Sequence, residues 1–403
     1  MPWLVPLVVF LGACVFDPRG VPPSSHWPPN SDLLVGDTQG GGADLLDGGA
    51  DGPHQACSDW TPRPVHFDPC QIQPPGVGLT LAAPGQWSYD TTSGALTDPQ
   101  GHPVASPPSS LVGNPPTRVL SVLSFDVGAD VKLRAVGDHP LVVASWSTAT
   151  VAGTLDVGSY RGDSTPGAGS NPTTCASHAP QAGQTVGIAG GGGGGAGFGD
   201  DGGAGGAGNV GRVPGGAGGA RVSVPVAIRG GCHGAGGGDS GGSGGYGGGA
   251  LQLTARTAIE VAATGKLLAG GAGGQGGSAG QRGAGGGGSG GYLGLEAPTV
   301  TLVAAAVLAA NGGGGGEGSS VALDGNSGID GQAAAKAASG AYGTATGGNG
   351  GAGGWRDNTA GTPGAQDPSV GGGGGGGGGV GFILVRSSQL DHKATASPGI
   401  TTP

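Results

Sequence analysis

Long glycine tracts constrain this chain more than any other feature of its sequence. Glycine supplies 101 of the 403 residues, and much of it gathers at 190–220, 230–249, 270–291 and 371–379. A glycine inside a helix costs roughly 1 kcal/mol relative to alanine. The helix-favouring residues Glu, Lys and Met are also scarce. We therefore expect no helices in the body of the protein.

Between the glycine tracts, apolar residues alternate with polar ones over short stretches, which predicts strands. Three stretches, beginning at Pro140, Ala250 and Tyr292, resemble copies of one unit of two or three strands. A segment at 380–386 has the features of the start of a fourth copy. The apolar positions that correspond between copies are Leu141, Leu251 and Leu293, then Val143, Leu253 and Leu295, and finally Leu155, Leu267 and Leu308.

One such unit cannot bury its own apolar face, whereas stacked units can. The repeats therefore predict an all-β protein, a parallel β-helix-like solenoid with long glycine-rich insertions, in which Leu251, Leu253, Leu293 and Leu295 point inward. The alternative is a β-sandwich with disordered loops. Two interpretations of the tracts stay open. They are either mobile loops or packed polyglycine-II-type segments, in which glycine allows close backbone approach.

The first residues are typical of an export signal. A short apolar run to Phe10 ends in Leu-Gly-Ala-Cys14, which resembles a bacterial lipobox, so we expect cleavage after residue 13 and a lipid on Cys14. An ordinary cleaved secretory peptide is the alternative. No Lys or Arg precedes the apolar run, a departure that is also consistent with a misassigned start codon.

Four cysteines remain after Cys14, and an even number favours disulfides in an oxidising compartment. We predict Cys57–Cys70 and Cys175–Cys232, because each pair lies within one compositional segment. No Cys-x-x-Cys spacing is present, so we expect no metal site.

Composition divides the chain into five parts. We expect a signal peptide at 1–13, a Pro/Gly/Asp-rich tether at 14–77 and a β-rich part with the first repeat at 78–160. A glycine-rich β-repeat region follows at 161–387, and a disordered tail is expected at 388–403.

Several motifs of enzymes and adhesins occur without their usual context. Gly-Asp-Ser-Gly-Gly at 238–242 matches the nucleophile segment of trypsin-like proteases, but it lies in a glycine tract and lacks the matching histidine segment. We therefore expect no catalysis at Ser240. Matches to G-x-G-x-x-G lack a strand–helix context and predict no dinucleotide cofactor. Arg161-Gly-Asp163 is an integrin-like tripeptide that short sequences produce by chance.

Segments at 66–70, 89–99, 290–302 and 309–318 resemble the glycine-rich hypothetical lipoproteins of myxobacteria, which are loosely labelled as similar to mycobacterial glycine-rich repeat proteins. The resemblance covers most of the chain after residue 60. It implies a surface location and a repeat architecture, and it carries over no functional residue.

Taken together, the sequence predicts a lipid-anchored structural protein of the outer membrane or cell surface that is not an enzyme and has no cofactor. The alternative is a surface adhesin or polysaccharide-binding module, whose partner is a polysaccharide or another surface protein. The net charge of −10 argues against nucleic acid as a partner, because no basic stripe is present to neutralise phosphates.

Overall fold

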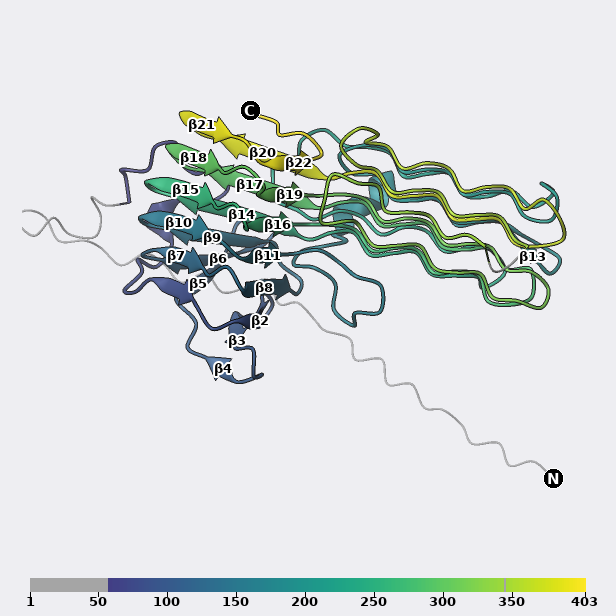
Figure 1. The fold of residues 1–403 in the computed structure, drawn as a ribbon, viewed down its shortest axis with the longest axis horizontal. Helices are drawn as coiled ribbons and strands as arrows, with labels where there is room; N and C mark the ends of the chain where they lie inside the picture. Colours follow the sequence, from purple (N-terminus) through teal and green to yellow (C-terminus); the bar gives the residue numbers. More distant parts are fainter. Residues whose placement is uncertain (1–56, 344–345) are drawn as a thin grey trace, which may run out of the picture. The chain divides into compact units, whose positions relative to one another are not determined.

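The computed structural model describes residues 57–343 and 346–403. Strands occupy one region of these residues, and long glycine-rich segments run side by side in another (Figure 1). Among the described residues, the helical elements are two short 3-10 turns, η1 (Pro69–Gln71) and η2 (Thr173–His178). No helix within the described residues is long and apolar enough to cross a membrane. The expected all-β class is confirmed.

Three sheets, here called A, B and C, hold nearly all the strands, and most neighbours within them are parallel. Sheet A has the order β1 (Leu79–Leu81), β7 (Phe125–Val127), β10 (Thr148–Val151), β15 (Ala258–Val261), β18 (Thr299–Leu302), β21 (Gln389–His392). Sheet B has the order β22 (Thr395–Ser397), β19 (Val307–Ala309), β16 (Lys266–Leu268), β11 (Thr154–Asp156), β8 (Val131–Val136), β2 (Gly85–Asp90), β3 (Ala95–Thr97), β4 (Pro103–Val104). Sheet C has the order β20 (Phe382–Arg386), β17 (Tyr292–Glu296), β14 (Ala250–Ala255), β9 (Leu141–Ser145), β6 (Thr117–Val122), β5 (Ser109–Val112).

From β6 onward the chain visits sheets C, A and B in the same order again and again, and we call one such passage a coil. The antiparallel exceptions are β3, β4 and β5 beside the first coils, and the separate pair β12 (Thr185–Val186) and β13 (Ala189–Gly190). This parallel pairing differs from the antiparallel sheets of a β-sandwich.

The strands of the predicted repeats are paired in the register that the sequence predicted. Leu251 lies opposite both Leu141 and Leu293, and Leu267 lies between Leu155 and Leu308. The segment at 380–386 supplies β20, which pairs with β17 as the fourth copy. A coil that the alignment missed, made of β6, β7 and β8, precedes the first recognised copy.

The main core lies between the three sheets and contains Leu251, Leu253, Leu293 and Leu295, as predicted. Sheet C is buried on its other face as well, where a second apolar cluster includes Trp60, Trp146 and other residues. Burial on both faces explains why the central strands of sheet C, β9, β14 and β17, are buried at every residue.

Both ends of the described chain differ from the expected boundaries. Residues 57–77 were predicted to continue a tether, yet Trp60, Phe67 and Ile72 are buried in the second cluster, because large apolar side chains gain by leaving water. Residues 388–403 were predicted to be a disordered tail, yet they contain β21 and β22, which add to the ladders of sheets A and B. Short polar strands on a sheet edge have a weak sequence signal.

The glycine tracts pack against one another through their backbones. In the segment 371–381, successive N–H groups donate to three different neighbouring segments, and the same neighbour returns every third residue. The three-residue period is that of a polyproline-II-type helix, which has no internal hydrogen bonds. The donor–acceptor pairs are Gly374 N to Ala365 O, Gly375 N to Gly316 O, Gly376 N to Gly193 O, Gly377 N to Thr362 O, Gly378 N to Gly313 O and Gly379 N to Ala196 O, at 2.8–3.1 Å.

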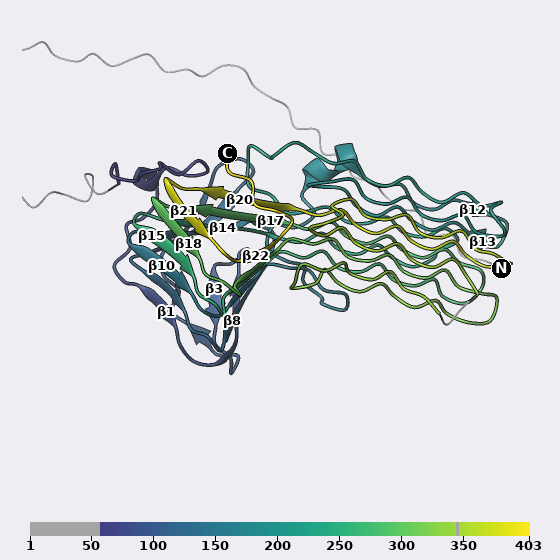
Figure 2. The same ribbon diagram turned by 45° about the horizontal axis from the view of Figure 1, so that its top comes forward.

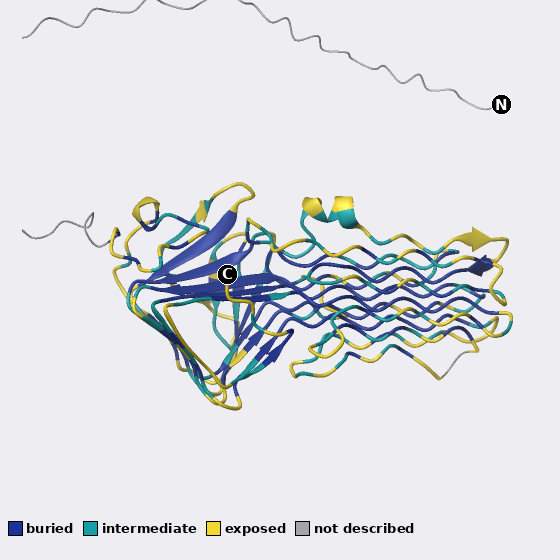
Figure 3. Ribbon diagram, turned by 90° about the horizontal axis from the view of Figure 1, so that it is seen from above, coloured by how far each residue is buried: buried dark blue, intermediate teal, exposed yellow. Residues whose placement is uncertain are grey.

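Carbonyl groups of the same segment accept from three further neighbours, through Gly206 N to Gly374 O, Gly351 N to Gly375 O and Gly287 N to Gly376 O. The segment 371–381 is therefore surrounded on six sides. Residues 371–379 are wholly buried, and the inner segments of the bundle form its dark centre in Figure 3. The interpretation of the tracts as mobile loops is thus replaced by a packed bundle.

Candidate functional site

Three adjoining hollows begin where the strands meet the glycine bundle and continue along the bundle to Tyr342. The first, of about 410 Å³, is lined by residues of β2 and β8 and shares Tyr160 and Asp163 with the second, of about 310 Å³. The third, of about 520 Å³, shares Arg161 and Ser327 with the second. Because each hollow shares walls with the next, together they form one extended groove, and the loop 160–163 lies at its centre.

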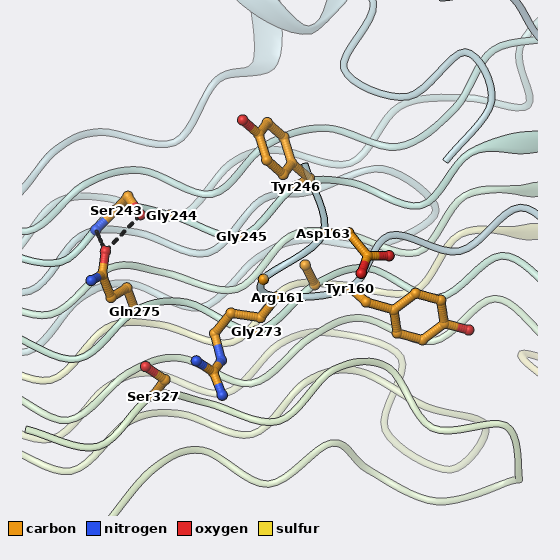
Figure 4. A pocket seen from close by; sticks show the side chains of 12 residues that line it. Tyr160, Arg161, Asp163, Ser243, Gly244, Gly245, Tyr246, Gly273, Gln275 and Ser327 are labelled. Carbon is orange, nitrogen blue, oxygen red and sulfur yellow. Dashed lines mark hydrogen bonds between the residues drawn. The ribbon is translucent and has the colours of Figure 1, made fainter. Parts of the chain in front are cut away.

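The middle hollow gathers side chains from well-separated parts of the chain (Figure 4). Tyr246 and Ser243 come from one glycine segment, Gln275 from the next, and Ser327 from a third. Ser243 Oγ donates to Gln275 Oε1 at 2.9 Å, so these polar groups are held together at the wall. The hollow thus offers an aromatic ring, hydroxyls and a side-chain amide to a ligand.

The loop 160–163 is held from both sides. On the strand side, Arg134 Nη2 donates to Asp163 Oδ2 at 2.8 Å, and the Tyr160 hydroxyl donates to Asp156 Oδ2 at 2.9 Å. On the bundle side, Arg161 N donates to Asp330 Oδ1 at 3.0 Å. Gly162 at the apex has a φ of +96°, which favours glycine over other residues. The groove is therefore pre-formed.

Charges on the strand side are largely paired. Asp156 is fully buried, and its Oδ2 atom lies 2.8 Å from Lys132 Nζ and 3.3 Å from Arg134 Nη1. The Arg134 guanidinium also lies 4.7 Å from the centre of the Tyr160 ring, a cation–π distance. Burial, together with the Asp156 carboxylate, raises the pKa of the Tyr160 hydroxyl, so this hydroxyl remains a hydrogen-bond donor across the physiological range.

The Arg161 guanidinium differs from these cations. Arg161 is exposed, and within residues 57–343 and 346–403 no ion pair or side-chain hydrogen bond engages its guanidinium. The Lys132 side chain is also 37% exposed beside the first hollow. The groove therefore presents positive charge in a chain whose net charge is −10.

A separate, mostly apolar hollow of about 220 Å³ lies against the outer face of sheet C. Glu296 on β17 lines it, with Gln252 Nε2 donating to Glu296 Oε2 at 2.9 Å. Burial raises the pKa of Glu296 to about 7, against the smaller opposing effects of the Val65 N–H and of Arg386. This carboxyl therefore gains a proton near neutral pH.

The far end of the bundle, here called the tip, consists of the turns at 184–190, 209–213, 239–241, 278–282, 320–324, 342–343 and 367–371. Figure 2 shows β12 and β13, which belong to the first of these turns, at the end away from the strands. Backbone hydrogen bonds join neighbouring turns, including Gly190 N to Gln281 O, Gly280 N to Ser320 O and Asn209 N to Gly371 O, at 2.8–3.0 Å. The exposed large apolar residues of the tip are Val186, Ile188, Val210, Val321, Leu323, Tyr342 and Val370.

The site residues predicted from the sequence are distributed over several regions. Cys14 lies outside the described residues. Both predicted disulfides form, Cys57–Cys70 beside sheet C and Cys175–Cys232 at the start of the bundle. Ser240 lies in an exposed turn of the tip with a φ of +51°. In the part of the chain that the structure describes, no group of three His, Cys, Asp or Glu side chains is arranged to hold a metal ion.

Sequence reasoning missed the groove. The Arg161-Gly-Asp163 tripeptide was recognised, but its neighbours Tyr246, Gln275 and Ser327 come from glycine tracts with no long-range signal in the sequence. The one available signal was the three-residue spacing of Ser243 and Tyr246, which places both on the same side of a three-residue-per-turn helix.

Comparison of the chain with family models, with curated proteins and with solved structures found no match.

Proposed function

We propose that the repeated passage through sheets C, A and B makes a parallel β-helix solenoid from which the glycine bundle projects. The recurring strand order and the in-register Leu stacks support this fold. One glycine hairpin, residues 270–291, then leaves β16, travels to the tip and returns to β17.

We further propose that the protein is an exported, lipid-anchored surface protein that acts without catalysis and makes contacts through the tip. Two disulfides favour an oxidising compartment, and the lipobox-like segment favours an anchor at Cys14 in the outer membrane or at the cell surface. The observation that carries the contact role is the set of exposed apolar side chains on the tip turns, with Ile188 71% and Val321 62% exposed. Apolar side chains gathered on a surface are typical of interaction sites.

The partner that fits the tip best is a second copy of this chain. The charges of the tip turns nearly cancel, because Arg212 and Arg282 offset two of the three carboxylates Asp239, Asp324 and Asp367, the last of which is buried. The whole chain carries −10, so a side-by-side contact between copies brings like charges together, whereas a tip-to-tip contact does not. Such a contact between neighbouring cells is homophilic adhesion.

Sedimentation velocity of the full chain tests this contact. We expect concentration-dependent dimers that the double variant Ile188→Ser/Val321→Ser abolishes. The matched control, Val77→Ser/Leu123→Ser, removes similarly exposed apolar side chains from the strand region (60% and 50% exposed) and should leave dimers intact. A parent protein that is monomeric at all concentrations, or a control that dissociates equally, contradicts the proposal.

Metabolic labelling with a palmitate analogue tests the anchor separately. We expect label on the parent chain and none on Cys14→Ser. Equal labelling of the two proteins contradicts lipidation at Cys14 without bearing on the tip.

A further inference from the structure

We propose that the groove around the loop 160–163 binds an acidic polysaccharide, a polymer of uronic acid residues. This binding site shares Tyr342 with the tip but includes neither Ile188 nor Val321, and it does not depend on the tip contact.

The shape of the groove favours a polymer over a small molecule. Its three hollows share Tyr160, Asp163, Arg161 and Ser327 as common walls and are open along the surface. An extended chain can occupy all three at once, and each occupied hollow adds contact area without a new cost of immobilising a separate ligand.

The lining favours sugars. A tyrosine lies in each part of the groove: Tyr160 between the first two hollows, Tyr246 in the middle one and Tyr342 in the third. A ring with an apolar face and a polar hydroxyl suits a sugar, which has apolar C–H faces and polar edges. Gln275, Ser243 and Ser327 add donors and acceptors for the hydroxyl groups of the ligand.

The charge balance favours an acidic polymer. The exposed Arg161 guanidinium can bind a carboxylate with two parallel N–H···O bonds. Lys132 adds a second, partly exposed cation. The acidic groups beside it are paired: Asp163, 43% exposed, lies 2.8 Å from Arg134 Nη2, and the fully buried Asp156 contacts Lys132 and Arg134. Two accessible cations suit the sparse carboxylates of a uronate chain. They are few for a nucleic acid, whose phosphates need a continuous row of Lys and Arg.

Affinity electrophoresis of the full chain in gels that contain alginate, polygalacturonate or neutral dextran tests the proposal. We expect retardation in the two uronate gels and none in dextran. Arg161→Gln should weaken uronate binding at least fivefold, whereas Arg212→Gln, which removes an exposed arginine from the tip, should not. Tyr246→Ala should weaken binding, and Tyr246→Phe, which keeps the ring, should restore most of it.

Three outcomes overturn the proposal: equal retardation in dextran, equal retardation by a single-stranded polynucleotide, or unchanged uronate binding by Arg161→Gln. The tip variant Ile188→Ser/Val321→Ser should bind uronate as the parent does. The groove and the tip contact can therefore fail independently.

Discussion

The number of neighbouring backbones around a position in the glycine bundle determines which side chain that position can hold. A Cβ atom added at Gly374, Gly375 or Gly376 would lie 1.9–2.0 Å from a carbonyl oxygen of Asn349, Gly285 or Gly203 respectively, in three different segments. No side chain fits there on any side. On the outer segment 201–208, glycines are buried or partly exposed while Ala204 faces solvent, so one residue in three is free to vary.

We predict that Gly375→Ala lowers the free energy of unfolding by about 1–3 kcal/mol or more, because the new methyl group must displace backbone rather than a flexible side chain. Gly236→Ala is the matched control in the same bundle. A Cβ there meets its nearest atom, Gly242 O, at an ordinary 3.7 Å. The control should be neutral or slightly stabilising, because alanine restricts the unfolded chain. Urea unfolding of both variants measures the difference, and equal stabilities contradict the packed bundle.

Glu296 makes the stability of the protein depend on pH. Its pKa is raised to about 7 in the folded state from an ordinary 4.5, so the folded protein holds a proton that the unfolded chain releases between these values. The contribution of Glu296 to the free energy of unfolding is therefore highest below about pH 4.5, falls as the pH rises and levels off above pH 7. The fall is of the order of 3 kcal/mol.

We predict that Glu296→Gln flattens this part of the pH dependence and makes the protein more stable than the parent at pH 8. The control is Glu260→Gln on β15, whose side chain is exposed. Urea unfolding at pH 5 and pH 8 measures both. A Glu296→Gln protein that loses as much stability as the parent between these pH values contradicts the effect of burial on this carboxyl.

At the scale of elements, the sequence predicted the strands well where apolar residues repeat in register. The spacing of apolar residues predicts that Leu141, Leu251 and Leu293 correspond, and in the structure Leu251 pairs with both of the others. The alignment missed the coil of β6, β7 and β8, because Arg118 and Ser121 interrupt the apolar run of β6 although both are buried. Arg118 Nε donates to Thr91 O at 2.9 Å, a long-range contact that no local pattern shows.

The groove and the tip could not be predicted for a related reason. Glycine carries no side-chain pattern, so a tract gives no sign of which other tract lies beside it. The order of the segments is set by backbone hydrogen bonds between residues far apart, such as Gly193 and Gly376. Only the length of each tract and its triplet spacing were visible in the sequence.

We predict that Leu295→Asp disrupts the coil of β17, β18 and β19. Leu295 is 1% exposed and lies between Leu253 and Val385 in sheet C, so the substitution buries an unpaired carboxylate and removes apolar contacts. The cost should be about 4 kcal/mol or more. Thr299→Asp, at a partly exposed position of β18 in the same coil, should cost far less. Thermal unfolding compares them, and tolerance of Leu295→Asp argues against the stacked repeats.

At the scale of the whole molecule, the strands and the bundle are one folding unit in our interpretation, because every long glycine segment is continuous with a coil or with another segment of the bundle. The segment 371–381 leads directly into β20 and contacts six neighbours. If this segment were a loop, its length would affect the free energy of unfolding only through the entropy of loop closure, which varies with the logarithm of the length. Deleting one residue would then matter less than deleting three.

The packed bundle predicts the opposite order. Removing Gly375 alone turns every preceding residue of the segment by about 120° relative to its neighbours, because the helix has three residues per turn. The N–H groups of Gly373 and Gly374, which in the parent donate to Gly190 O and Ala365 O, would then face the wrong segments, and each buried group left without a partner costs about 1–3 kcal/mol. Removing residues 374–376 shortens the segment by one turn, about 9 Å at 3.1 Å per residue, but keeps its phase. We therefore expect the melting temperature to fall in both variants and to fall further for the single deletion. A single deletion that melts closer to the parent than the triple deletion would mean that the tract is a loop after all.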